Sequence, residues 1–363
     1  MFGLKSSGRQ TWKTTWKHQL SEYVTQVAWS PDGEYLAACS AAGEIVIHIV
    51  GENTIESLEP SATPINQLSF SADGQFLAAG DQSGQVRIWN RQGQSFVPLM
   101  THNRSGCWIE HLCWHPTEPL VAFNVGHTAE VLNVVTQSLV AKLDFENSSV
   151  LCLNWHPTNG QLIVGGYQNV KVWSSHSWQE DPLVVELGSV SLAIAWSADG
   201  QYLASGNMDR SITVLEWQGE QPKPKPWVMS GFPGKVCHLA WSSKLSAGSV
   251  PLLAATSVEG VVIWEQDLDP FVGWEGHLLE GHTQAVKAIA FQPQTKHLAS
   301  AGADGFVNLW HNADRLTQTL TDASQGFSCL CWHPQGNFLA AGGSQGELFI
   351  WSQSQEGRGF GKM

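Results

Sequence analysis

The stretch VTQVAWSPDGEYLAACS, residues 24–40, decides the fold because similar stretches occur seven more times along the chain. Each copy is an alternating apolar segment that ends in an aromatic residue, followed by a polar turn and a run of small residues. The aromatic residues recur at intervals of 41 to 50 residues, and they are Trp29, Phe70, Trp114, Trp155, Trp196, Trp241, Phe291 and Trp332. A period of this length indicates a repeat architecture, although the length of 363 residues alone would suggest two domains.

A second strand-like run follows each copy. Its last position is Trp89, Trp173, Trp264, Trp310 or Trp351 in five repeats, and His48, Leu132 or Leu215 in the other three. The runs are short and β-rich, they are separated by Gly, Asp, Ser and Pro turns, and no helical period is apparent. We therefore predict that each repeat forms about four strands.

A four-stranded unit of this size cannot bury both of its faces alone. Neighbouring units must stack face to face, and closing them into a ring leaves no exposed end. The sequence thus predicts an all-β protein, a single ring of four-stranded blades. Eleven of the 18 tryptophans end strands in this scheme, and we expect them to fill the wedges between blades.

The composition excludes several classes of protein. Its 32 acidic and 19 basic residues give a formal charge of −13, which argues against nucleic-acid binding because phosphates must be neutralised by Lys and Arg. The seven cysteines form no CxxC pair, which favours a reducing compartment. We find neither a secretory signal nor an apolar stretch long enough to span a bilayer, so we expect a cytoplasmic protein without a membrane span.

The seventh repeat carries the most complete motif. Gly281-His282 precedes its first strand, and Ser300, Ala303-Asp304-Gly305 and Trp310 follow. With these residues the chain resembles the WD-repeat β-propeller family. The resemblance implies that His282, Ser300, Asp304 and Trp310 form a structural hydrogen-bonded tetrad. The other repeats depart from the motif, and the Gln-rich, Lys-poor composition resembles stand-alone bacterial members.

Eight copies predict an eight-bladed β-propeller, with seven blades plus an irregular copy as the alternative. The last repeat ends in its third strand near Trp351, and the segment TWKTTWKHQL, residues 11–20, can supply the missing outer strand. We therefore expect an N-terminal segment (1–23) that closes the last blade, a propeller (24–353) and a flexible Gly-rich tail (354–363).

No catalytic constellation is apparent in the sequence. Gly342-Gly343-Ser344-Gln345-Gly346 fits the pattern GxSxG, but a nucleophile elbow needs a strand before it and a helix after it, whereas this stretch lies in a predicted hairpin turn. We find no HExxH motif, no phosphate-binding GxxxxGK[ST] loop and no GxGxxG that opens a helix. We therefore expect no enzymatic activity and no cofactor.

One column of the aligned repeats lies on the innermost strands, and it contains Gln26, Gln67, His111, Cys152, Ala193, His238, Ala288 and Cys329. The candidate metal ligands in this column are His111, Cys152, His238 and Cys329, because imidazole and thiolate bind Zn and Cu. Ligands spread around an eight-bladed ring would lie too far apart to complete one tetrahedron. A metal-binding accessory protein is therefore the alternative function, and a protein-interaction scaffold is the first.

The family resemblance implies that partners dock on the face formed by the loops before the first strands and the turns between second and third strands. There we expect Tyr23, Trp108, Arg210 and Lys235 to bind a protein partner, because aromatic residues and Arg concentrate interface energy. The acidic ring favours basic partners, and we expect the propeller itself to be monomeric. The proline-rich arm QGEQPKPKP, residues 218–226, is either a second attachment point or a stiff linker.

Overall fold

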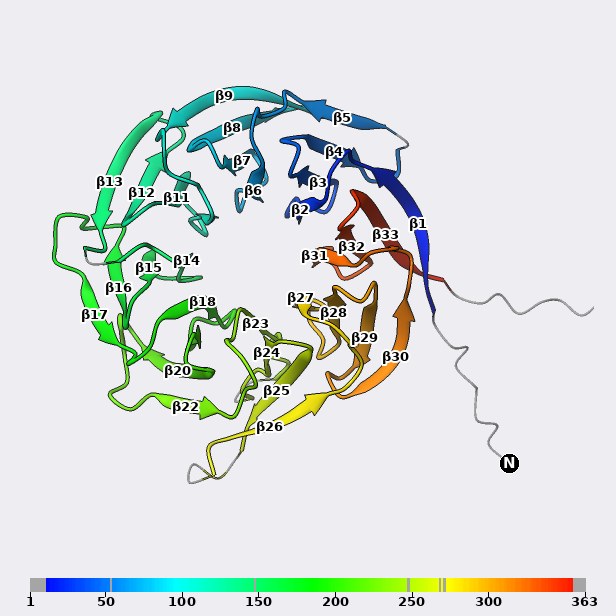
Figure 1. Ribbon diagram of the computed structural model, residues 1–363. Coiled ribbons are helices and arrows are strands. Elements are labelled where there is room, and N and C mark those ends of the chain that lie inside the picture. Colours follow the sequence, from blue (N-terminus) through cyan, green and yellow to red (C-terminus); the bar gives the residue numbers. More distant parts are fainter. Residues whose placement is uncertain are drawn as a thin grey trace, which may run out of the picture.

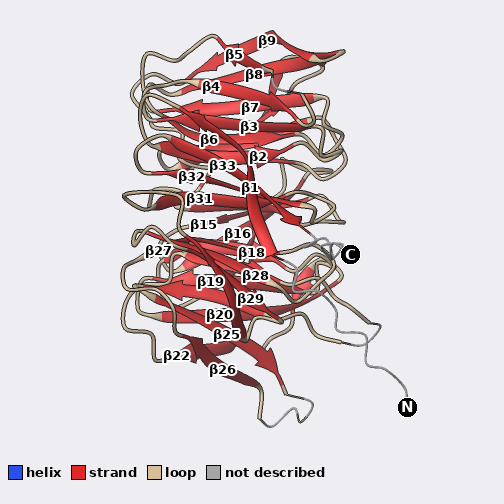
Figure 2. Cartoon of the chain, turned by 90° about the vertical axis from the view of Figure 1, so that its right-hand side faces the viewer, coloured by secondary structure: helices blue, strands red, loops and turns tan. Residues whose placement is uncertain are grey.

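The strands of the chain form eight antiparallel sheets arranged as blades around a central axis (Figure 1). The computed structural model describes residues 11–52, 54–146, 148–246, 249–267, 269 and 272–354. Within these residues all regular structure is strand, and the sheets stack into a disc in the side view of Figure 2. The predicted eight-bladed β-propeller is confirmed, and the seven-bladed alternative is wrong. No helix that could cross a membrane occurs among the described residues.

The first four blades each contain four strands in chain order. Blade one consists of β2 (Val24–Trp29), β3 (Tyr35–Ser40), β4 (Ile45–Ile49) and β5 (Ile55–Leu58). Blade two consists of β6 (Ile65–Phe70), β7 (Phe76–Asp81), β8 (Gln85–Gln92) and β9 (Ser95–Asn103). Blade three consists of β10 (Leu112–Trp114), β11 (Leu120–Val125), β12 (Thr128–Asn133) and β13 (Ser138–Asp144). Blade four consists of β14 (Cys152–Trp155), β15 (Gln161–Gly165), β16 (Asn169–Ser174) and β17 (Leu183–Glu186).

The second half of the ring contains two departures from this order. Blade five consists of β18 (Ser191–Trp196), β19 (Tyr202–Asn207), β20 (Ser211–Gln218) and β22 (Trp227–Ser230), with the short β21 (Gln221–Pro222) also pairing with β20. Blade six consists of β23 (His238–Trp241), β24 (Leu253–Ser257), β25 (Gly260–Gln266) and β26 (Trp274–Leu279). Blade seven consists of β27 (Val286–Phe291), β28 (Leu298–Gly302), β29 (Val307–His311) and β30 (Arg315–Leu320). Blade eight consists of β31 (Phe327–Trp332), β32 (Phe338–Gly343), β33 (Glu347–Ser354) and β1 (Thr11–Gln19).

The direction of the strands divides the connections between two faces of the disc. In each blade the first strand is innermost and the fourth lies at the rim, as Figure 1 shows for β2 and β5. Because the strands alternate in direction, the loops before the first strands and the turns between second and third strands lie on one face, which we call the upper face. The other connections lie on the lower face.

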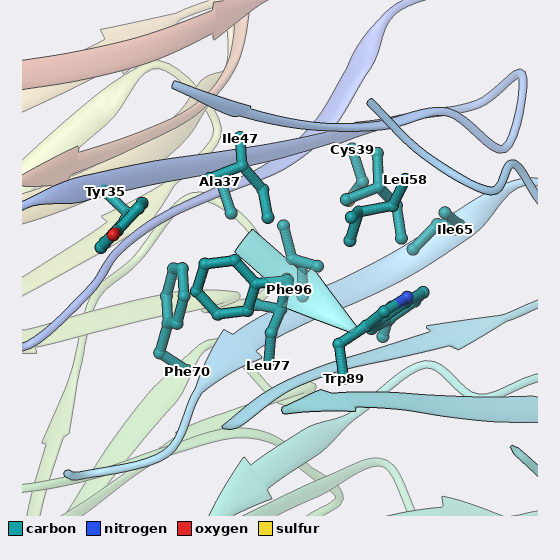
Figure 3. Packing of buried hydrophobic residues seen from close by; sticks show 13 residues of the cluster. Tyr35, Ala37, Cys39, Ile47, Leu58, Ile65, Phe70, Leu77, Trp89 and Phe96 are labelled. Carbon is teal, nitrogen blue, oxygen red and sulfur yellow. The ribbon is translucent and has the colours of Figure 1, made fainter. Parts of the chain in front are cut away.

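The core is divided into wedges between adjacent blades. In the wedge between blades one and two, Tyr35 and Ile47 from one sheet pack against Phe70, Leu77 and Trp89 from the next (Figure 3). Of the eleven tryptophans expected in such wedges, eight are buried and three are half-buried, namely Trp196, Trp241 and Trp264. The predicted packing role of these tryptophans is therefore confirmed.

Five of the six tryptophans that end the first strands also join neighbouring blades through hydrogen bonds, whereas the indole N–H of Trp196 has no partner among the described residues. The indole N–H of Trp114 donates to the carbonyl of Ser69 in the preceding blade at 2.9 Å, and Trp241 donates in the same way to Ala195 at 3.0 Å. The bond from Trp29 to the Cys331 carbonyl, 3.4 Å long, links blade one to blade eight. The repeated Trp thus buries apolar area and satisfies its polar atom at the same time.

The strand β1 completes blade eight, as the sequence predicts. It pairs antiparallel with β33 from Thr11 opposite Ser354 to Gln19 opposite Glu347. Gln318 of blade seven exchanges two hydrogen bonds with the backbone of Trp12, 2.8 and 2.7 Å long. The ring is therefore closed by segments from the two ends of the described chain, and the tail expected at 354–363 lies outside the described residues apart from Ser354.

The turns between first and second strands follow two designs. In blades one, two and five, a Ser and an Asp two residues later cap the turn, as in the 2.5 Å bond from Ser30 Oγ to Asp32 Oδ1. In blades four and eight a histidine in the sequence Trp-His-Pro caps this turn in place of the Ser and Asp. His156 accepts backbone N–H groups through Nδ1 and lies 3.1 Å from the Gly200 carbonyl through Nε2, and His333 does the same with Gly33. These histidines therefore link successive blades.

Candidate functional site

The four residues predicted to bind a partner all lie in connections of the upper face. Trp108 is 55% exposed in the loop before β10, and Tyr23 is 42% exposed before β2. Arg210, in the turn between β19 and β20, and Lys235, in the loop before β23, are also exposed. A backbone hydrogen bond of 3.2 Å from Val236 to Asn207 holds those two connections together. The connections that carry Arg210 and Lys235 are thus neighbours on the upper face, whereas Tyr23 belongs to a blade two places away from that of Trp108.

Arg210 occupies an unusual backbone position. Its φ is +67°, in the left-handed region that disfavours side chains. The matching turns of blades one, two, seven and eight place a glycine here, with φ between +83° and +88°, namely Gly43, Gly84, Gly305 and Gly346. Gln168 takes the matching position in blade four with a φ of +63°, so Arg210 is a candidate because its charged side chain is exposed on this turn.

Three further exposed apolar residues occur on the upper face, and the sequence analysis missed them. Tyr167 is 53% exposed between β15 and β16, Met208 is 52% exposed between β19 and β20, and Val258 is 49% exposed between β24 and β25. A large apolar residue where polar or glycine residues are usual in this turn was the available signal. Together with Trp108 they place one exposed apolar side chain on each of blades three to six, and we call these four residues the apolar arc.

The tetrad residues of blade seven form one hydrogen-bonded chain. His282 Nδ1 lies 3.0 Å from Asp304 Oδ2, and His282 Nε2 lies 2.8 Å from Ser300 Oγ. The indole N–H of Trp310 donates to the same Ser300 oxygen at 2.9 Å. Ser, His and Asp are the residue types of a hydrolytic triad, but Ser300 is fully buried, so no substrate reaches its hydroxyl. These hydrogen bonds fasten the loop before β27 to β28 and β29.

Blade five uses a different polar network in the same place. Asn207 accepts a hydrogen bond from Ser205 at 2.8 Å. Its amide nitrogen donates to the hydroxyls of Ser211 and Thr213, both at 3.0 Å. All four side chains are buried, so this network replaces the missing His and Trp in fixing the blade.

A column of polar residues on the third strands of several blades was also missed, with Glu130 and Asn308 buried and Arg87 half-buried. It lies two positions before the slot that holds Trp in most blades. Arg87 donates to the Glu59 carbonyl at 2.7 Å, and Asn308 donates to the Gly281 carbonyl at 2.9 Å. Glu130 is buried and accepts from Arg104 Nε at 2.7 Å. In each case the partner lies in the segment that leads into the same blade, so the column fastens the upper-face loops to the blades.

The column proposed for metal binding lines the central channel. All eight of its members border a cavity of about 490 Å³. Burial lowers the pKa of His111 and of His238 to about 4, and it raises the pKa of Cys152 to about 12 and that of Cys329 to about 11. At neutral pH the thiols are therefore protonated, a state in which they are poor ligands.

The channel does not gather these ligands into one site. Within the described residues no group of three or more His, Cys, Asp or Glu side chains could hold a metal ion. Cys152 instead lies within hydrogen-bonding distance of the backbone and hydroxyl of Ser191, at 3.6 and 3.5 Å. The sequence GGSQG, residues 342–346, lies at the turn between β32 and β33, so the helix that a nucleophile elbow needs does not follow it.

Eight blades, a closing N-terminal strand and a His-Ser-Asp-Trp tetrad define a repeat β-propeller. A sequence model described as "WD domain, G-beta repeat" matches residues 11–48, 53–90, 137–174, 187–215, 273–311 and 314–352, more than half of the chain. The chain therefore belongs to the WD40 repeat family.

Curated relatives share short or partial stretches with the chain. It is 26% identical to THO complex subunit 3 of Arabidopsis thaliana over 57% of this chain and 64% of that protein. It is 28% identical to Cell division cycle 20.1, cofactor of APC complex, also from Arabidopsis thaliana, over 51% of this chain and 40% of that protein. Striatin-4 of Mus musculus is 39% identical over 18% of this chain and 8% of that protein. The chain thus spans less than two thirds of these relatives, and because they are eukaryotic proteins they do not support a bacterial member.

Proposed function

We propose that the protein is a non-enzymatic scaffold that presents its upper face to protein partners. The observation that carries the proposal is the apolar arc, which exposes Trp108, Tyr167, Met208 and Val258 on four consecutive blades. Large side chains that stay exposed on one face of a rigid fold are typical of interaction sites. The printed names of two relatives, a subunit of one complex and a cofactor of another, support a role within an assembly.

The charges near the apolar arc give the proposed interface its polar rim. Arg210 lies in the same turn as Met208 and Lys235 in the adjoining loop, and both can pair with acidic groups of a partner. Over longer distances the formal charge of −13 attracts basic partners. All seven cysteines are free thiols, which supports the proposed location in a reducing compartment such as the cytoplasm.

Affinity capture tests this function. The wild-type chain, a Trp108→Ala/Tyr167→Ala double variant and a Val135→Ala variant are used to capture partners from extract of the source cells, and bound proteins are quantified by mass spectrometry. Val135 is 66% exposed on the lower face, so its variant controls for the loss of an exposed apolar side chain. We expect the double variant to lose a defined set of proteins that the control retains. Equal capture by all three chains would reject the upper face as the docking site.

A further inference from the structure

A cavity of about 350 Å³ opens at the seam where the ring closes, between blades one and eight. Its wall contains the rings of Trp16, Trp29, His48 and Phe338, and Glu52 lies beside them. The residues come from β1, the end of β2, β4 and the loop after it, and the start of β32, so the cavity lies at the rim on the lower face, away from the apolar arc. We call it the seam pocket. Its volume falls in the range of small-ligand sites.

The seam pocket exists because of one substitution in the repeat pattern. His48 stands in the slot that holds Trp in five of the eight blades. The smaller imidazole leaves space that an indole fills elsewhere, and Trp16 of the closing strand covers only part of it by stacking on His48, with ring centroids 4.1 Å apart. Trp29 and Phe338 form a second pair of nearly parallel rings, 6.1 Å between centroids. Flat aromatic surfaces thus border the space.

One polar atom of the pocket lacks a hydrogen-bond partner, and the carboxylate beside it has no cationic partner among the described residues. His48 is buried, and its Nδ1 has no hydrogen-bond partner among the described residues. Glu52 is exposed and accepts hydrogen bonds from the neutral side chains of Thr54 and Gln94, but within the described chain no cationic group pairs with it. A buried polar atom without a partner costs free energy that a ligand can recover.

We propose that the seam pocket binds a guanidinium group. Aromatic walls attract a cation, and a planar guanidinium stacks on an indole better than a tetrahedral ammonium does. Its several N–H donors can pair with the Glu52 carboxylate and, once the imidazole turns about χ2, with His48 Nδ1. The group can belong to an arginine side chain of a protein or to a small free guanidine compound. The inference is independent of docking on the upper face.

Binding of simple guanidinium probes tests the proposal. The full chain is titrated with N-acetyl-arginine amide, and the indole N–H signals of Trp16 and Trp29 are followed by NMR. N-acetyl-citrulline amide, which keeps the planar shape without the charge, is the matched ligand control. We expect saturable shifts with the arginine derivative, with a dissociation constant on the order of 1 mM, and weaker ones with the citrulline derivative. A short peptide with one central arginine is titrated in parallel, and tighter binding of the peptide than of the amide would point to a protein as the source.

Two pocket variants and one control variant make the test decisive. Glu52→Gln removes the charge without changing shape and should weaken binding about fivefold, whereas Glu118→Gln removes an exposed carboxylate elsewhere on the lower face and should change nothing. His48→Trp restores the residue that fills this slot in other blades and should abolish binding while the ring stays folded. Equal binding of the citrulline derivative, unchanged affinity in Glu52→Gln, or no saturable shift in the wild type would overturn the proposal.

Discussion

The hydroxyl of Ser300 joins two buried nitrogen atoms, and it is the nearer of the two hydrogen-bond partners of His282 Nε2, because Asn308 Nδ2 lies 3.4 Å away. The hydroxyl lies 2.8 Å from His282 Nε2 and accepts from the Trp310 indole at 2.9 Å. In a Ser300→Ala variant both nitrogens lose this partner inside a blade without access to water. We expect the free energy of unfolding to fall by about 2 kcal/mol, measured by urea denaturation. Ser324→Ala, which removes an exposed hydroxyl before the next blade, should have an effect near zero, and an equal loss in both variants would contradict the structural role of the tetrad.

The side chain of Arg210 lowers the stability of the fold at an exposed turn where it can contact a partner. Its positive φ of 67° is strained for any side chain, and four other blades use glycine at the matching position. Arg210→Gly should therefore raise the free energy of unfolding by about 1 kcal/mol. If Arg210 contacts a partner, the same variant should capture less of that partner in the affinity experiment. A variant that is less stable than the wild type would show that the arginine side chain holds the turn and does not strain it.

At the scale of the blades, the repeat period was sufficient to predict most of the fold. The aromatic residues from Trp29 to Trp332 mark the ends of the first strands, and the missing outer strand of the last repeat indicated that residues 11–20 close the ring. Both inferences depend only on the alternation of apolar and polar residues and on the number of repeats. These two features persist although the individual repeats differ in sequence.

The candidate site was less accessible from sequence because its residues lie in turns, where no period constrains the side chain. Trp108 stood out as an aromatic residue before a strand, whereas the only sequence signal of Tyr167 and Val258 is an apolar residue in a turn that is usually polar, which does not show that the side chain is exposed. The polar column of Arg87 and Glu130 was hidden for another reason. Each member is fixed by a partner in the preceding connection, and the residue types that make these contacts differ from blade to blade.

The closing strand β1 should control the stability of the ring. Trp12 packs edge-on against Trp332, with ring centroids 5.1 Å apart, and Asp322 accepts hydrogen bonds from both Thr14 and Trp351, each at 2.7 Å. Removing residues 1–19 deletes the contacts of Trp12 and Thr14 and leaves the edge of β33 unpaired. We expect the free energy of unfolding to fall by at least about 3 kcal/mol, and amide exchange in β33 to accelerate.

A shorter truncation provides the control for this prediction. Removing residues 1–10 leaves β1 and all of its pairing with β33 in place, so stability and amide exchange should match those of the full chain. Equal stability of the two truncated chains would mean that the ring holds without its closing strand.

For the whole molecule, acid sensitivity follows from the number of histidines that the ring keeps neutral. Burial lowers the pKa of eight of them below the usual value of 6.5, namely His18, His48, His111, His115, His156, His238, His297 and His333. The unfolded chain therefore binds more protons than the folded one as the pH falls below about 6.5, and stability is lost in that direction. Lowered carboxyl pKa values, such as that of Asp199, which is hydrogen-bonded to Ser197 and Lys244, extend the loss below pH 4.

The channel histidines should dominate this loss between pH 6.5 and pH 4, because the pKa of His111 and of His238 falls to about 4. Glutamine occupies the same column in blades one and two, at Gln26 and Gln67, so His111→Gln/His238→Gln is a substitution that the channel already accommodates. We expect urea denaturation of the wild type to show a fall in unfolding free energy on the order of 2 kcal/mol across this interval that the double variant lacks. An unchanged slope in the double variant would mean that the channel admits enough water to solvate both imidazolium ions, and the acid sensitivity would then belong to the histidines between the blades.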